Sequence, residues 1–107
     1  MRKGLLDFCV LNALKGGESY GYELIQRLKR LDELAIAEST VYPILNRLRK
    51  DRFVKIRMGA SPAGPPRRYF SLTALGNHHL KALNAYWDDL CRSIENLRNA
   101  EPEQTEQ

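Results

Sequence analysis

Apolar positions recur along this chain with two different periods, and the change between them divides the chain into elements. Three segments in the first half have the 3.6-residue period of an α-helix, at residues 3–15, 20–31 and 39–52. Four aliphatic residues of the third segment are spaced i, i+3, i+4 and i+7 and form one stripe for burial: Val41, Ile44, Leu45 and Leu48. Between 53 and 72 the period is two, and from 73 to 99 it is helical again. The pattern predicts three helices, a β-hairpin and a long final helix; residues 34–36 could add a brief strand.

The hairpin prediction depends on two short strands and the loop between them. Val54, Ile56 and Met58 alternate with cations, as in a half-buried strand, and "RRYFSL" at 67–72 provides the second strand. The loop "ASPAGPP" at 60–66 contains too many glycines and prolines for regular structure.

Polar residues and helix breakers predict where the helices begin. Ser19 is placed to cap the second helix, and Thr73 to cap the last one. Pro43, inside the third helix, allows two interpretations. Either Ser39 or Thr40 caps that helix, so that Pro43 falls in the first turn, or the helix begins a turn earlier and lacks one hydrogen bond.

The final helix carries a seam for packing against other helices. Its members recur at alternating spacings of three and four residues, as in a heptad repeat: Leu80, Leu83, Trp87, Leu90, Ile94 and Leu97. The seam is too short for an independent coiled coil. The first helix, which is apolar nearly all round, is one partner for it, and a second copy of the final helix is another. The sequence therefore predicts a homodimer.

The length of the chain and the distribution of its charges indicate which kind of molecule it binds. A chain of 107 residues suggests one domain with a short appendage. Residues 26–68 hold eleven Lys/Arg against four Asp/Glu, whereas residues 69–107 hold three against six. A basic block within a small domain indicates a polyanionic partner. No apolar run approaches the roughly 18 residues of a membrane span. Asp7 and Asn12 interrupt the apolar N-terminal stretch, which therefore predicts a helix of a mature cytoplasmic protein rather than a leader.

Residues that carry catalytic or metal chemistry lack the necessary spacing. Cys9 and Cys91 both lie in helical apolar patterns and are expected to be small buried thiols rather than a disulfide. His78 and His79 are adjacent on a helix and diverge by about 100°, so they are expected on a surface rather than on a shared metal. The sequence contains no Ser–His–Asp order, Gly-rich phosphate loop or paired acids. We expect no enzyme activity, no cofactor and no metal.

Three stretches carry a resemblance to a known family. The segments "SYGYELIQRL", "STVYPILNRLRKD" and "GPPRRYFSLTALG" resemble the PadR family of bacterial transcriptional regulators, over about residues 4–76. The resemblance implies a mainly α fold with a small β-hairpin, in which a winged helix-turn-helix DNA-binding domain occupies 1–72. It also implies a C-terminal dimerisation helix at 73–99, of the short subfamily with one such helix. The acidic residues 100–107 are expected to form a flexible tail.

The family implies a sequence-specific repressor that binds an inverted-repeat operator in double-stranded DNA. The acid-poor outer face of the third helix is then a recognition surface for the major groove, and the hairpin is the wing. The expected DNA-binding residues lie on these two elements: Ser39, Thr40, Tyr42, Asn46, Arg47, Lys50, Arg57, Arg67 and Arg68. Asn46 and Arg47 could contact either bases or backbone, and Tyr20 and Tyr22 either phosphates or the core.

Three alternatives remain open at the level of the sequence. The hairpin cations could simply protect a sheet edge from pairing, and the whole domain could be a protein-docking winged helix without specific DNA binding. Trp87 could be a plain core residue. The resemblance to small multidrug-responsive regulators implies instead that a planar, lipophilic effector binds between the two Trp87 rings at the dimer interface and relieves repression.

Overall fold

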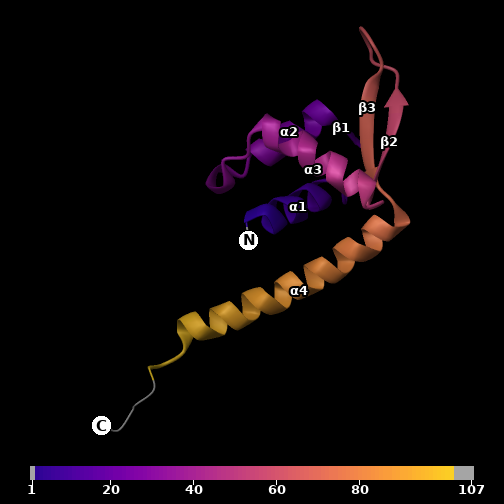
Figure 1. Ribbon diagram of the computed structural model, residues 1–107. Helices are drawn as coiled ribbons and strands as arrows, with labels where there is room; N and C mark the ends of the chain where they lie inside the picture. Colours follow the sequence, from indigo (N-terminus) through magenta and orange to yellow (C-terminus); the bar gives the residue numbers. More distant parts are fainter. Residues whose placement is uncertain (1, 103–107) are drawn as a thin grey trace.

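The computed structural model describes residues 2–102, which form a mainly helical winged helix-turn-helix with a small antiparallel sheet (Figure 1). The elements follow one another in this order: α1 (Arg2–Ala13), β1 (Ser19–Tyr20), α2 (Gly21–Lys29), a 3₁₀ turn (Asp32–Leu34), α3 (Glu38–Lys50), β2 (Val54–Gly59), β3 (Arg67–Leu72) and α4 (Ala74–Asn99). The predicted fold class, with its three helices, hairpin and long final helix, is confirmed.

The sheet has a third strand that the periodicity did not predict. Its order is β1-β3-β2, and Ser19 lies opposite Phe70 on β3. Ser19 is buried and donates a hydrogen bond to the Glu23 carboxylate (2.9 Å), so the prediction that it caps α2 is wrong. Tyr20 occupies the capping position of α2 without a side-chain hydrogen bond. The brief strand predicted at 34–36 is also wrong, because Asp32–Leu34 form the 3₁₀ turn.

Helix α3 begins earlier than either predicted cap. The residue before its first turn is Ala37, which is extended and makes no side-chain capping bond, so neither Ser39 nor Thr40 caps the helix. Pro43 therefore lies beyond the first turn, where it removes the hydrogen bond that would reach the Ser39 carbonyl. Ser39 is exposed, so water can satisfy that carbonyl. The second interpretation of Pro43 is the correct one.

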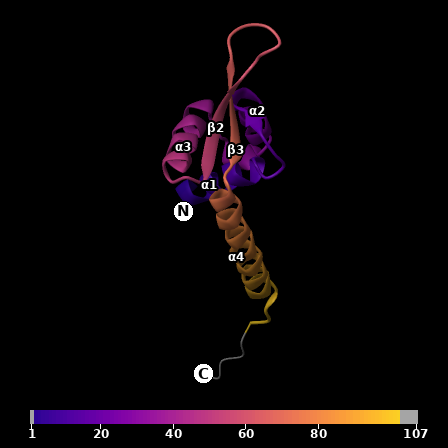
Figure 2. The ribbon, with the colours of Figure 1, turned by 90° about the vertical axis from the view of Figure 1, so that its right-hand side faces the viewer.

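The core lies between α1, α2, α3 and the inner face of the sheet. The buried stripe of α3 is confirmed, with each of its four members at most 5% exposed. Val54, Phe70 and Leu72 cover it from the sheet. Met58 is 59% exposed, against the alternation prediction, because the outer half of the hairpin extends past the core (Figure 2).

Helix α4 begins against the domain and then runs away from it (Figures 1 and 2). Thr73 caps α4 as predicted, accepting a hydrogen bond from the Gly76 amide (2.9 Å). Leu80 is only 3% exposed because it joins the core of its own chain, which removes it from the predicted dimerisation seam. Further along, the Trp87 ring packs against Phe8 of α1, with 5.3 Å between the ring centroids. Residues 91–99 are all exposed.

The remaining predictions concern the two cysteine thiols, the C-terminal tail and membrane-spanning helices. Cys9 is half-buried, and burial raises the pKa of its thiol. Cys91 is exposed, so the expectation that both thiols are buried is wrong for this one; both are free. Most of the tail predicted at 100–107 lies outside the described residues. Among the helices that the structure describes, none is long and apolar enough to cross a membrane.

Candidate nucleic-acid interface

The two faces of the hairpin have different surroundings. In the β2–β3 register Met58 lies opposite Arg68, and Arg57 lies opposite Tyr69. Because side chains alternate between the two faces of a strand, Met58 and Arg68 lie on the same face of the hairpin. Nearer the base of the hairpin, this face covers the core. Both are exposed beyond the core, and Arg68 shares a groove with Tyr42 of α3. Arg57 is on the other face.

On that other face, Arg57 is already engaged. Its guanidinium donates two hydrogen bonds to the Glu18 carboxylate (2.9 and 2.6 Å) and lies 4.7 Å from the centre of the Tyr69 ring. The hydrogen bond from Arg57 holds the pKa of the Glu18 carboxyl below its ordinary value. A cation with a bidentate carboxylate partner contributes less to an anion-binding surface than a free one.

Arg47, another predicted DNA contact, also has a partner within the chain. Its guanidinium forms an ion pair with Asp7 of α1, and both side chains are about one-quarter to one-third exposed (34% and 25%). This turns Arg47 towards α1 and away from the hairpin. Of the other predicted residues on α3, Thr40 is half-buried, whereas the following four are exposed: Ser39, Tyr42, Asn46 and Lys50.

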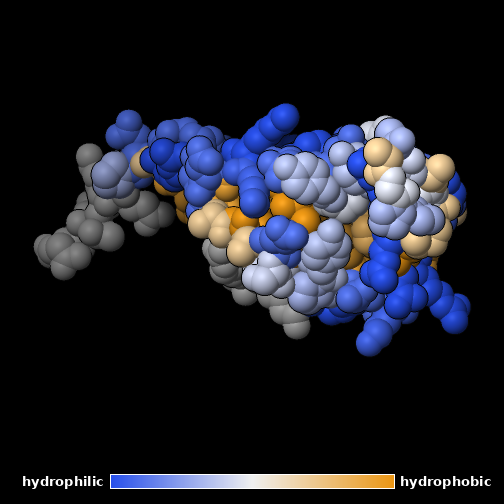
Figure 3. Space-filling model, turned by 90° about the horizontal axis from the view of Figure 1, so that it is seen from above, coloured by the Kyte–Doolittle hydropathy of each residue, from blue (hydrophilic) through white to orange (hydrophobic). Residues whose placement is uncertain are grey.

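A groove of about 670 Å³ lies where the N-termini of α2 and α3 approach the hairpin. Its lining consists of Tyr20, Gly21, Tyr22, Tyr42, Arg67, Arg68 and Phe70. Seen from above, hydrophilic side chains surround a hydrophobic area near the middle of the molecule (Figure 3). The structure therefore brings Tyr42, Arg67 and Arg68 together, three residues that the sequence predicted separately.

The positions of the groove residues are fixed by close packing. A Cβ atom at Gly21 would lie 2.7 Å from the Tyr42 hydroxyl, so a larger residue there would displace the tyrosine side chain from the first turn of α2. The Arg67 guanidinium stacks on the Tyr20 ring, 4.4 Å from its centre. Tyr20 therefore serves packing, whereas Tyr22 is 62% exposed. Two arginines, tyrosine hydroxyls and the positive end of α2 together favour a phosphate.

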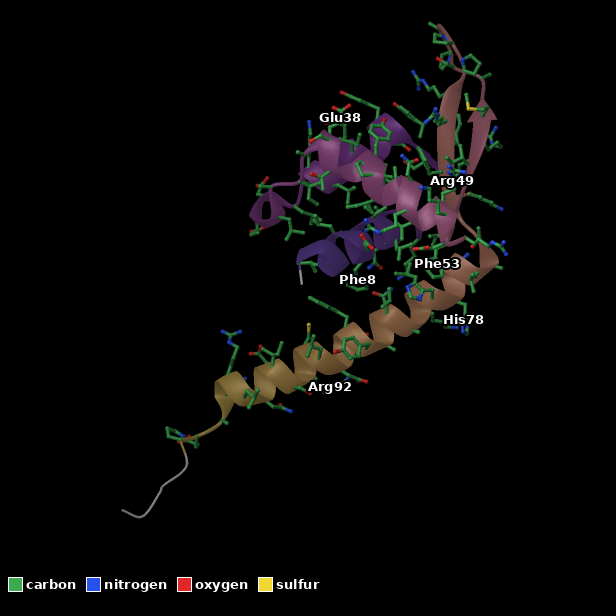
Figure 4. All side chains as sticks on the ribbon, in the orientation of Figure 1. Phe8, Glu38, Arg49, Phe53, His78 and Arg92 are labelled. Atoms are coloured by element: carbon green, nitrogen blue, oxygen red, sulfur yellow. The ribbon has the colours of Figure 1, made fainter. Side chains whose placement is uncertain are left out.

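Sequence reasoning missed Arg49. This residue is exposed, and Figure 4 shows it on the side of α3 nearest the hairpin. It lies seven residues after Tyr42 and three after Asn46, so all three share one flank of the helix. That spacing can be read in the sequence, but Arg49 is also adjacent to the buried stripe, so the helical pattern alone does not assign it to the outer face.

The helix order, the antiparallel sheet and the cationic groove beside α3 define a winged helix-turn-helix protein. Residues 10–82 match the model of a known family, which is described as the transcriptional regulator PadR-like family. The chain belongs to this family and is a regulator of transcription rather than an enzyme.

Solved structures agree over nearly the whole chain. A Streptococcus transcriptional regulator is 39% identical, with a TM-score of 0.81 over 91% of this chain and 95% of that one. A PadR-like transcriptional regulator from Bacillus cereus is 31% identical, with a TM-score of 0.83 over 92% and 96%. Bacillus subtilis PadR, in complex with operator DNA, shares the fold at 24% identity and a TM-score of 0.66, over 96% of this chain and 53% of that chain.

Proposed function

We propose that the protein is a cytoplasmic repressor that binds an inverted-repeat operator as a homodimer. The observation that carries this proposal is the groove of Tyr42, Arg67 and Arg68 beside the exposed flank of α3. A protein-docking module would not need two arginines and an acid-poor helix face in one place. The operator complex of the Bacillus subtilis relative supports the same use of the fold.

The role that we assign to each predicted DNA contact follows from the exposure of its side chain and from its partners within the chain. Asn46 and Arg49 are placed to reach base edges in the major groove, with Ser39 and Lys50 beside them. Tyr22, Tyr42 and Arg67 suit backbone phosphates, and Arg68 suits a phosphate or the minor groove. Thr40 is half-buried at the start of α3, so we assign it a contact with the DNA backbone only. Arg47 and Arg57 already have carboxylate partners, and we therefore assign them supporting roles.

Arginines 68 and 57 offer a matched test of DNA binding, because they lie on opposite faces of one hairpin. Replacing Arg68 by alanine should weaken operator and random DNA alike and reduce the salt slope of log K by about one. Replacing Arg57 by alanine should leave that slope within error. Gel-shift titrations from low to moderate salt measure both. Wild-type binding that is insensitive to salt would favour the docking module, and equal effects of the two substitutions would refute the division between the two faces.

The proposed dimer uses the apolar side of α4 that the chain itself leaves uncovered. Leu83, Trp87 and Leu90 line an apolar groove with α1, and beyond it Ile94 and Leu97 are 46% and 77% exposed. A second copy of the same helix covers such a seam by two-fold symmetry. It would set two α3 helices about one DNA turn, ~34 Å, apart.

Trp87 is also the residue that we propose as an effector contact. It is 40% exposed, and it lines an apolar groove of about 380 Å³ together with Gly4, Leu5, Phe8, Leu83, Tyr86 and Leu90. The Phe8 and Trp87 rings are tilted by 36°, so a flat apolar guest can lie against the exposed side of Trp87. In the dimer, the second Trp87 would complete a slot for a planar lipophilic compound.

Titration with planar cationic dyes should quench the fluorescence of Trp87, since it is the single tryptophan of the chain. Bound dye should weaken operator binding about five- to hundred-fold, the usual range of coupling between two sites. A Trp87→Leu variant should repress normally and no longer respond to dye. If fluorescence stays constant across a varied panel, Trp87 is a packing residue and the effector proposal fails.

A further inference from the structure

Helix α4 is attached to the turn that ends the recognition helix, through several contacts within a few residues. The Thr73 hydroxyl donates a hydrogen bond to the Arg52 carbonyl (2.6 Å), and the Thr73 amide donates to the Phe53 carbonyl (3.1 Å). The turn itself is closed by the Phe53 amide, which donates to the Leu48 carbonyl of α3 (2.9 Å). Arg52 adopts the left-handed conformation (φ 68°) that this sharp reversal requires.

Two further contacts hold α4 at a short distance from that turn. A Cβ atom at Gly76 would lie only 2.0 Å from the Phe53 carbonyl oxygen, so glycine is needed for the helix to come this close. One turn along α4, the His79 ring stacks on the Phe53 ring, with 4.1 Å between centroids and 5° between planes. The neighbouring His78 is exposed and points to the other side of the helix (Figure 4).

This junction therefore joins an element that contacts DNA to the element proposed to carry the partner subunit. Leu90, near the middle of the proposed dimer seam, is eleven residues beyond His79. Eleven helical residues measure about 16 Å, so a rotation of about 10° at the junction displaces the seam by about 3 Å. That displacement is close to the 3.4 Å between successive base pairs. A rigid junction is needed if the dimer is to distinguish half-sites that differ in spacing by one base pair.

We propose that the stack of His79 on Phe53 is a positioning device, which fixes the half-site spacing that the dimer accepts. The inference rests on the proposed function, because it requires two DNA-binding domains joined through α4. His79 is not a DNA contact; it acts by holding α4 at one angle to α3. A flat ring in van der Waals contact resists tilting of α4 because the helix cannot tilt without separating the two rings.

The test compares operators that share both half-sites but differ in the spacer by one or two base pairs in either direction. Wild type should prefer one spacing. His79→Ala should reduce that preference about three- to ten-fold, which corresponds to the free energy of one aromatic pair. Binding to an isolated half-site should stay unchanged. His79→Phe, which keeps a ring over Phe53, should restore the preference, and His78→Ala should have no effect.

The possible outcomes separate this inference from the proposed function. A wild-type protein without affinity for any inverted repeat would overturn the proposed function itself. A wild type that prefers one spacing, together with a His79→Ala variant that keeps the same preference, would overturn the positioning role alone. Equal losses on half-sites and full sites would show that His79 merely stabilises the domain. A thermal melt of each variant identifies that case independently.

Discussion

Replacing Leu90 by aspartate should convert the protein to monomers and abolish tight binding to an inverted repeat. The carboxylate would be placed in the apolar seam, where burial removes its water. A monomer binds each half-site separately, so affinity for the full operator should fall about 10²- to 10⁴-fold, as expected when two linked sites become independent. Light scattering at micromolar concentration and gel-shift titrations measure the two effects.

Ala85→Asp is the matched control, because it adds the same charge to the exposed side of α4 away from the seam. It should remain dimeric and bind the operator with unchanged affinity. A Leu90→Asp variant that is still dimeric would show that subunits associate elsewhere. Circular dichroism of both variants tests whether α4 itself is retained.

Replacing Gly76 by alanine should destabilise the domain strongly, because the Cβ contact there is the shortest at any glycine that the structure describes. The new Cβ would overlap the Phe53 carbonyl, and a backbone atom cannot rotate away as a side chain can. Relief requires α4 to move away from the turn, at the expense of the Thr73 hydrogen bonds and the His79 stack. We expect a loss of about 2–4 kcal/mol in the free energy of unfolding. Denaturant titration followed by circular dichroism measures this free energy.

Gly16→Ala provides the comparison for the same chemical change in open space. A Cβ atom at Gly16 would have no neighbour within 4 Å, and the residue does not have a positive φ. Its stability should be unchanged or slightly higher, because alanine restricts the unfolded chain. If Gly76→Ala were equally harmless, the close approach of α4 to the turn would be wrong.

The sequence was sufficient for elements with a long regular period. The stripe of α3, the strands around the breaker-rich loop and the Thr73 cap all depend on residues close together in the chain, so local rules apply to them. Strand β1 has only two residues and no period of its own. It exists because Ser19 and Tyr20 pair with Phe70 and Tyr69, about 50 residues away, and that pairing is a property of the folded domain.

The same distinction explains why two of the predicted DNA contacts turned out to have partners within the chain. Arg47 and Arg57 look like free cations in the sequence, but their partners Asp7 and Glu18 are 40 and 39 residues away. Likewise, heptad spacing placed Leu80 in the seam because it cannot tell whether an apolar position faces its own core or another chain. In each case the missing information was a contact between distant segments.

The length of α4 links the folding of one chain to the number of chains present. Its last residues, 91–99, are exposed throughout and receive no support from the winged domain. The end of a helix that lacks tertiary packing frays readily in water. The proposed dimer would stabilise the far end of α4, so the order of this segment should rise with protein concentration. At low copy number we therefore expect chains with a folded winged domain and a frayed end of α4, so the proposed repression should begin only once enough chains have accumulated to form the proposed dimer.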